Sequence, residues 1–325
     1  TMEYMHIWFL GMPFIAIPMM GNNALRATGD ATSPGIIMAI GSMANLVLDP
    51  LLIFGLAGFP ALGIAGAAYA TLIGRAFALF ASLGILGFRK KMLTFEKPQL
   101  KLLLQSWGKL LYIGIPAAMT GVLGPVTMAI IIRLVAQYGT EAVAAVSAGA
   151  KIDSLTIMVL ASMGSVVMPF VGQNWGAGKM DRIREAHRWV YKFCIGWGVL
   201  MYAVVVIFAH PIAQQFGKEE RVVELIVLYL YITSTGLGLE GLWRIVSGAF
   251  NGMHQPIHSA MLNMVCLIVI TLPTAAIGSV MYGLEGLFIG LAAGKLLSGL
   301  VGIGWANYLH GRLEEKVNMQ VVPAV

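Results

Sequence analysis

The chain has 325 residues, of which 58% are hydrophobic and only 11% are charged, and its formal net charge is +6. Apolar stretches longer than about 18 residues recur along it, which is typical of transmembrane helices. This composition excludes a soluble enzyme and predicts an all-α, polytopic membrane protein.

In chain order, the apolar stretches predict nine transmembrane helices. They lie near residues 4–25, 34–55, 63–87, 111–137, 143–172, 189–216, 222–250, 258–281 and 285–309. Thirteen Lys and Arg residues fall in the loops 26–33, 88–110 and 173–188 and in the tail after 309, whereas the intervening loops hold two. The positive-inside rule therefore places the basic loops and the C-terminus in the cytoplasm. The positive net charge reflects this topology and is no evidence for nucleic-acid binding.

The second predicted helix carries an acid inside the apolar run "NLVLDPLLIFG". Asn45 and Asp49 are four residues apart, so they share one helix face. Pro50 has no backbone N–H, and it therefore frees the carbonyl of Leu46 one turn earlier. Thr71, in the next helix, can reach the same depth. Together these oxygens suit a hard cation, and intramembrane acids are costly enough to suggest a function. The alternative is structural: Asp49 hydrogen-bonds a helix end, and Thr71 bonds the carbonyl four residues before it.

Further charges lie within the later predicted helices. Lys151 and Asp153 are two residues apart and cannot face each other, so each needs a partner on another helix, with Arg133 and Glu240 as candidates. Glu240 can be neutralised by Arg244, one turn later in the same helix. These five residues line a cleft or form internal ion pairs, and both possibilities stay open. Arg75 and Lys295 are also intramembrane cations, for which internal pairing is the favoured interpretation.

An internal repeat indicates a transporter. "GIAGAAYATLIGR" at 63–75 aligns with "GLEGLFIGLAAGK" at 283–295, so that three glycines and the final cation coincide. The first three helices thus resemble the last three, and repeats of this kind are a signature of transporters. If the fourth to sixth helices open a second copy, we expect the first copy to lack three helices. The expectation is a partial N-terminal lobe of three helices and a complete, pseudo-symmetric C-terminal lobe of six.

Several segments resemble multidrug and toxic compound extrusion (MATE) transporters. They are "ALRATGDATSPGIIMAIGSMANLVLDPLLIFG" at 24–55, "GIAGAAYAT" at 63–71, "AGAKID" at 148–153 and "VGQNWGAGKMDRIREA" at 171–186. Asn45 and Asp49 look most like the DinF-like prokaryotic branch. The resemblance implies that Asn45, Asp49 and Thr71 form an N-lobe cation site together with an aspartate on a first helix that the chain lacks. If Na⁺ is the coupling ion, Asp49 is implied as its ligand.

The resemblance also bears on a second cation site. Glu240 matches by position an acid that some MATE branches carry on their tenth helix. Those branches also place a glutamate on the seventh helix, where this chain reads "LGPVTM" with Gly124 and Pro125. This departure argues for coupling through the N lobe.

The predicted division has four parts. They are a partial N-terminal lobe at 1–87 (family helices four to six), a cytoplasmic linker at 88–110, a C-terminal lobe at 111–309 (family helices seven to twelve) and a cytoplasmic tail at 310–325. The expected function is antiport by alternating access: efflux of organic compounds, cationic or amphipathic, against inward H⁺ or Na⁺. We expect a monomer in a bacterial or archaeal inner membrane, with lipid and small organic substrates as its partners and with no cofactor.

Other functions fit the sequence less well. A lipid-linked saccharide flippase of the same superfamily is the alternative within transport, and a more cationic cleft would favour it. An intramembrane enzyme would need clustered acids or a HExxH motif, and neither occurs. A channel would need a filter-like loop, which is also missing.

Overall fold

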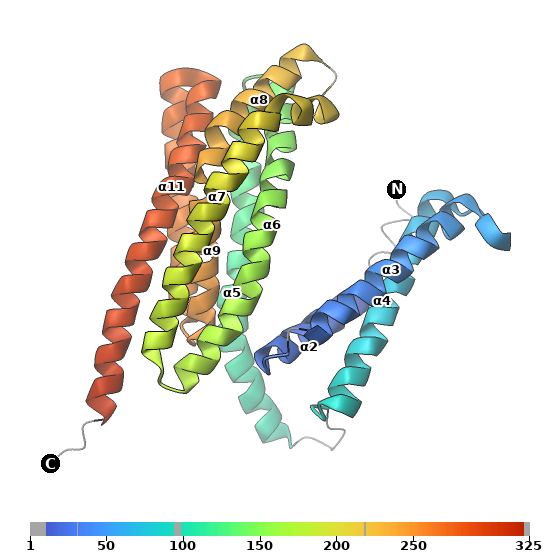
Figure 1. Ribbon diagram of the computed structural model, residues 1–325, viewed down its shortest axis with the longest axis vertical. Helices are drawn as coiled ribbons and strands as arrows, with labels where there is room; N and C mark the ends of the chain where they lie inside the picture. The colour runs from blue at the N-terminus through green and yellow to red at the C-terminus, as the bar shows by residue number, and fades with distance from the viewer. Residues whose placement is uncertain (1–10, 31, 94–98, 218, 322–325) are drawn as a thin grey trace. The chain divides into compact units, whose positions relative to one another are not determined.

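The computed structural model describes residues 11–30, 32–93, 99–217 and 219–321, with side chains as far as residue 312. Within these ranges the chain is helical and no strand occurs, as the sequence predicts (Figure 1). Contacts between residues divide the chain into two compact units, Thr1–Gln99 and Leu100–Val325. The predicted division into lobes, linker and tail stays a prediction. Residues 100–110 of the predicted linker are helical.

The first unit is built on two long helices that run antiparallel. Its described elements are α2 (Met12–Ala27), α3 (Thr32–Phe54), a short 3-10 turn (Leu56–Gly58), α4 (Gly63–Gly84) and a π-helical turn (Ile85–Arg89). The helices α3 and α4 lie side by side along their lengths (Figure 1). The beginning of the predicted first helix, at residue 4, lies outside the described residues.

Asp30 fixes the turn between α2 and α3. Its carboxylate accepts hydrogen bonds from the backbone N–H of Ser33 at 2.9 Å and from the Ser33 hydroxyl at 2.8 Å. Lys90, just after the π-helical turn, places its ammonium 3.0 Å from the same carboxylate. The Ser33 hydrogen bonds and the Lys90 charge hold the pKa of Asp30 well below its usual range. Asp30 thereby connects the start of α3 to the far end of α4.

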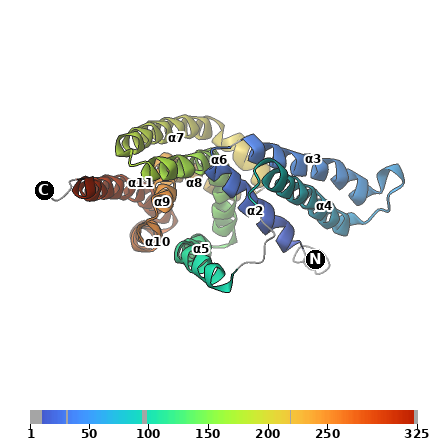
Figure 2. The ribbon, with the colours of Figure 1, turned by 90° about the horizontal axis from the view of Figure 1, so that it is seen from below.

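The second unit is a bundle of longer helices. They are α5 (Leu100–Ala136), α6 (Thr140–Gly176), α7 (Met180–Phe216), α8 (Glu220–Thr233), α9 (Leu237–Gly252), α10 (Pro256–Met264) and α11 (Leu272–Val321), with a 3-10 turn (Ser234–Gly236) before α9 and a π-helical turn (Val265–Thr271) before α11. In the bundle, α6 lies against α9 and α7 lies against α8 (Figure 1 and Figure 2). The large side chains of Trp243, Phe250 and Phe288 are fully buried in its core.

Helix α11 contains a reversal of the chain. The backbone angles of Tyr282 and Gly283 are not helical, and Gly283 has a φ of 63°, a conformation that favours glycine. Beyond this point the chain runs back along itself, because the backbone of Gly286 contacts that of Gly278. This close approach requires glycine on both sides, since a Cβ at either position would collide with the opposite backbone.

Seven helical stretches of the described residues are long and apolar enough to cross a membrane. Two of the nine predicted helices fall within one of these stretches, Pro256–Arg312, which includes the reversal, and α2 has only 16 described residues. The nine-helix count and the three-plus-six lobes therefore stay predictions. Several helices also extend beyond the predicted apolar runs, because polar residues such as Lys101 and Arg182 continue a helix that hydropathy cannot detect.

Candidate functional site

The structure brings Asn45, Asp49 and Thr71 together. The Asn45 amide nitrogen lies 3.4 Å from both the Asp49 carboxylate and the Thr71 hydroxyl. With the amide turned over, its nitrogen donates to the other Asp49 oxygen at 3.3 Å and its oxygen accepts from the Thr71 backbone N–H at 3.2 Å. In either orientation Asn45 connects the two predicted partners, and all three side chains are half-buried.

Glycines explain why α3 and α4 can place these side chains so close together. A Cβ on Gly74 would lie 2.7 Å from the Gly41 carbonyl oxygen and 3.2 Å from the Asn45 Cβ. A Cβ on Gly66 would collide with the backbone of Leu52 near the other end of the pair. Small residues at these positions let two membrane helices approach closely, so that polar side chains can bond across the interface. The glycines of the repeated motif therefore position the polar cluster.

The partners of Asp49 are electrically neutral. Its carboxylate accepts from the Asn45 amide, and no cation of the described residues lies within ion-pair distance of it. The Thr71 hydroxyl donates to the Ala67 carbonyl at 2.9 Å, which is the bond that the structural alternative expects. That bond leaves the Thr71 oxygen as an acceptor. The cluster thus offers carboxylate and hydroxyl oxygens, the ligand type that suits a hard cation. Whether the three residues bind a cation stays a prediction.

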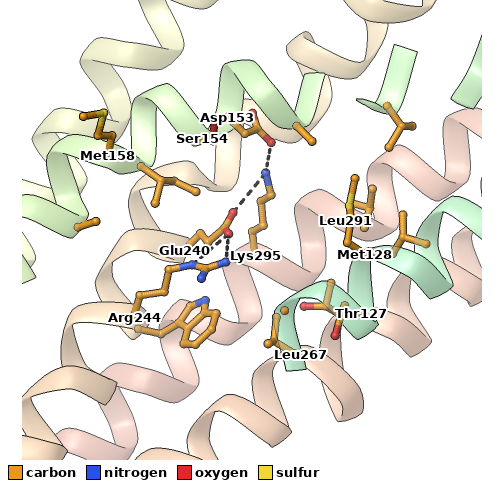
Figure 3. A pocket seen from close by; sticks show the side chains of 18 of the residues that line it. Thr127, Met128, Asp153, Ser154, Met158, Glu240, Arg244, Leu267, Leu291 and Lys295 are labelled. Atoms are coloured by element: carbon orange, nitrogen blue, oxygen red, sulfur yellow. Dashed lines mark hydrogen bonds and ion pairs between the residues drawn. The ribbon is translucent and has the colours of Figure 1, made fainter. Parts of the chain in front are cut away.

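A second charged cluster lies in the second unit and contains a chain of ion pairs. The Lys295 ammonium lies 2.7 Å from Asp153 and 3.4 Å from Glu240. Arg244 contacts Glu240 at 2.7 Å, the pairing that their spacing predicts. Figure 3 shows the four side chains, with Lys295 between the two acids. Two carboxylates therefore face two cations, and the cluster is neutral when all four groups are ionised.

Tyr229 and Gly149 set the position of Asp153. The Tyr229 hydroxyl donates to the Asp153 carboxylate at 3.0 Å from α8. The Tyr229 ring lies directly against Gly149, one turn before Asp153 on α6, where any side chain would collide with it. Gly149 belongs to the "AGAKID" segment, so the glycine makes room for the aromatic ring that holds the acid. Sequence reasoning missed Tyr229, because nothing local in the sequence indicates this contact.

This cluster borders a cavity of about 440 Å³ within the second unit. Asp153, Glu240, Arg244 and Lys295 line it together with apolar side chains of α5, α6, α9 and α11, including Met128 (Figure 3). An apolar cavity with a few charged groups is the usual form of a small-molecule site. Its two methionines, Met128 and Met158, can adapt to ligands of different shape.

The two pairings suggested for Asp153 and Lys151 are wrong. Asp153 pairs with Lys295 and not with Arg133, and Glu240 pairs with Lys295 and Arg244 and not with Lys151. Arg133 and Lys151 are both exposed, and neither forms an ion pair within the described part of the chain. Lys295 is the residue that connects the network. In the sequence, Lys295 is a single lysine in a long apolar segment, and internal pairing is the interpretation that the sequence favours. The structure contains such pairs, with Asp153 and Glu240.

No set of three or more His, Cys, Asp or Glu side chains within the described residues could hold a metal ion. Both cysteines, Cys194 and Cys266, are buried and unbridged.

Comparisons with known proteins agree with this architecture. A family model described as MatE matches residues 116–277. The chain is 36% identical over 315 residues to a FAD transporter of Shewanella oneidensis, in a match that covers 97% of this chain and 69% of the relative. The chain belongs to the MATE family. A multidrug export protein of Staphylococcus aureus, MepA, is 26% identical over 322 residues, and the match covers 96% of this chain and 68% of MepA.

Solved MATE structures show the same fold. The crystal structure of the Vibrio cholerae MATE transporter VcmN in the bent form matches with a TM-score of 0.88 at 27% identity. The match covers 96% of this chain and 69% of VcmN. The chain is thus a multi-pass membrane protein with the MATE transporter fold. The DinF-like branch stays a prediction.

Proposed function

We propose that this MATE chain takes part in secondary active efflux of organic compounds, coupled to inward movement of H⁺ or Na⁺ at Asp49. The observation that carries the proposal is the Asn45–Asp49–Thr71 cluster, an acid with neutral partners on closely packed membrane helices. A carboxylate in a low-dielectric site favours its protonated form, whereas an adjacent Na⁺ favours the ionised form. Such a group can exchange one cation for another as its surroundings change.

Coupling requires that the cation prefers one conformational state to another. In the proposed cycle, H⁺ or Na⁺ binds Asp49 in one state of alternating access and leaves in the other. Asn45 and Thr71 act as neutral ligands or orient the carboxylate. The cluster of Asp153, Glu240 and Lys295 already contains its own counter-charges, which supports the first unit as the coupling site.

The substrate has two candidates. One candidate is a cationic or amphipathic organic compound, and a relative named as a multidrug export protein supports the export of drugs. A second candidate is a flavin nucleotide such as FAD, which the 36% identity to a FAD transporter favours. The comparisons do not favour a lipid-linked saccharide flippase.

The proposed arrangement in the membrane follows from the basic loops. Nine helices cross a bacterial inner membrane in two lobes, 1–87 and 111–309, joined by a cytoplasmic linker at 88–110 and followed by a cytoplasmic tail at 310–325. The repeat between 63–75 and 283–295 supports the pseudo-symmetry. The transporter works as a monomer.

The test is transport in inverted membrane vesicles from cells that express the complete gene product carrying this chain. Either ΔpH or a Na⁺ gradient is imposed, with ethidium in one series and FAD in another. We expect uptake of one compound into the vesicles under one gradient, and none when both gradients are collapsed. Gradient-independent movement of both compounds would overturn antiport, and FAD uptake without ethidium uptake would assign the flavin substrate.

A further inference from the structure

A separate cavity of about 260 Å³ lies between α7 and α11, away from the charged cluster described above. Its lining side chains are mostly basic or polar: Arg184, His187, Arg188, Tyr191, Asn307 and His310. None of the described residues that line it is acidic. The four lining residues of α7 follow the spacing of one helix face, so α7 presents a continuous polar strip to this cavity.

Two buried polar atoms in the cavity wall lack partners. His187 is only 2% exposed, and its Nδ1 lies 3.1 Å from Nε2 of His310. Its other nitrogen, Nε2, and the hydroxyl of Tyr191 are buried and have no hydrogen-bond partner in the described part of the chain. Leaving a buried polar atom unsatisfied costs stability, so these two atoms are candidate contacts for a ligand.

The rings that carry these two groups are stacked in one row with His310. The rings of His187 and Tyr191 are stacked with an interplanar angle of 3°, and those of His187 and His310 are stacked at 22°. When His310 Nε2–H donates to His187 Nδ1, His187 Nε2 carries the proton and becomes a free donor. Together with the Tyr191 hydroxyl and the Arg188 guanidinium, it forms a set of donors that suits an oxyanion.

Neighbouring side chains indicate the depth of this cavity in the membrane. Trp189 on α7 is 62% exposed and Tyr308 on α11 is 60% exposed. Exposed Trp and Tyr of membrane helices gather at the level of the lipid headgroups. The ammonium of Lys192 lies 5.0 Å from the Trp189 ring centre, a further basic group at the same level. An anion at this depth is available from the headgroup of an acidic lipid.

We propose that the cavity between α7 and α11 binds the phosphate group of an anionic phospholipid, held by His187, Arg188 and Tyr191. Basic pockets between membrane helices are suited to such headgroups. The site is distinct from the proposed cation and substrate sites, so its test is independent of transport. Free inorganic phosphate has the same chemistry, and the experiment separates the two sources.

The experiment measures lipid binding to the full chain in detergent by native mass spectrometry. Phosphatidylglycerol, phosphatidylcholine and inorganic phosphate are titrated separately against the parent protein and against Arg188→Gln and Tyr191→Phe. Arg188 is exposed, and Tyr191→Phe keeps the stacked ring, so both variants retain the fold. Arg182→Gln is the matched control, because it removes an exposed arginine from the same helix outside the cavity.

We expect the parent protein to bind phosphatidylglycerol at least tenfold more tightly than phosphatidylcholine. Each cavity variant should weaken phosphatidylglycerol binding by roughly tenfold, the effect of one hydrogen bond to a charged group. Arg182→Gln should leave it unchanged. Equal affinity for phosphatidylglycerol and phosphatidylcholine would overturn the site. So would a loss of phosphatidylglycerol affinity in Arg182→Gln as large as that in the cavity variants. Binding of inorganic phosphate without phosphatidylglycerol would overturn the assignment to a lipid.

Discussion

The polar clusters of the two units differ in the charge of the side chains that contact their acids. In the second unit, Asp153 and Glu240 share Lys295, and Glu240 also pairs with Arg244. In the first unit, Asp49 contacts the neutral Asn45 amide instead. A fixed counter-charge holds an acid ionised, whereas a neutral ligand set leaves its charge to be balanced by a mobile cation. This difference is why we propose charge exchange in the first unit, whereas the second unit holds a network of ion pairs.

The largest loss of stability is expected when the ion pairs of the second cluster are broken. Lys295→Met leaves the buried Asp153 and the half-buried Glu240 without their shared cation, and breaking a buried pair in this way costs about 3–5 kcal/mol. We expect the thermal unfolding temperature in detergent to fall markedly. The double variant Asp153→Asn/Lys295→Met should recover part of the loss, since one carboxylate no longer carries charge.

The matched control for this experiment is Lys151→Met, because Lys151 is an exposed lysine of α6 without an ion pair among the described residues. It should change the unfolding temperature little. Equal losses in the two lysine variants would show that Lys295 is not the centre of the network.

The next prediction concerns the packing that places Asn45 near Thr71. Gly74→Ala inserts a Cβ 2.7 Å from the Gly41 carbonyl oxygen and 3.2 Å from the Asn45 Cβ, so α3 and α4 must separate. Overpacking of this kind costs about 1–3 kcal/mol. Thermal unfolding measures the cost. Gly84→Ala on the same helix meets no atom within 4 Å and serves as the control. If both variants unfold alike, the close approach at Gly74 is not what holds the pair together.

Smaller effects are expected from the neutral ligands. Asn45→Ala and Thr71→Ala each remove one uncharged partner, worth about 0.5–1.5 kcal/mol. The concentration of the coupling cation that gives half-maximal efflux should therefore rise by roughly 2- to 13-fold in each variant. Transport at saturating cation should persist. An unchanged cation dependence in both variants would remove Asn45 and Thr71 from the site.

The smallest effect concerns Asp30, outside the membrane helices of the first unit. Its pKa is lowered by the hydrogen bonds from Ser33 and by Lys90, so the folded state favours the ionised form. The stability that ionised Asp30 gives to the folded state is therefore complete above the usual Asp pKa of about 3.9, and it is lost as the pH falls below that value. The unfolding temperature of Asp30→Asn should approach that of the parent protein only at acid pH. A constant difference from pH 3 to 7 would contradict this assignment.

Local spacing predicted the contacts within one helix. The i, i+4 relation put Asn45 beside Asp49 and Glu240 beside Arg244, and the structure contains both contacts. Apolar runs predicted the helices but underestimated their length, because polar residues extend a helix beyond the membrane.

Contacts between distant helices could not be predicted. Lys295 and Asp153 are 142 residues apart, and Tyr229 reaches Asp153 over 76 residues. Such pairs depend on how α6, α8 and α11 pack, which no local pattern encodes. Gly149 was visible in the sequence, but its role became clear only when the Tyr229 ring was found against it.

The most direct test of the central claim is gradient-driven efflux by Asp49→Asn in the complete gene product that carries this chain. The substitution keeps the size and hydrogen bonding of the side chain but removes its titratable charge. Asp181→Asn, an exposed acid at the start of α7, is the control. We predict that efflux falls to background in Asp49→Asn while its expression and substrate binding persist, and that Asp181→Asn transports normally. Efflux at the parental rate with unchanged pH and Na⁺ dependence would contradict the account and move the search for the coupling site to Asp153 or Glu240.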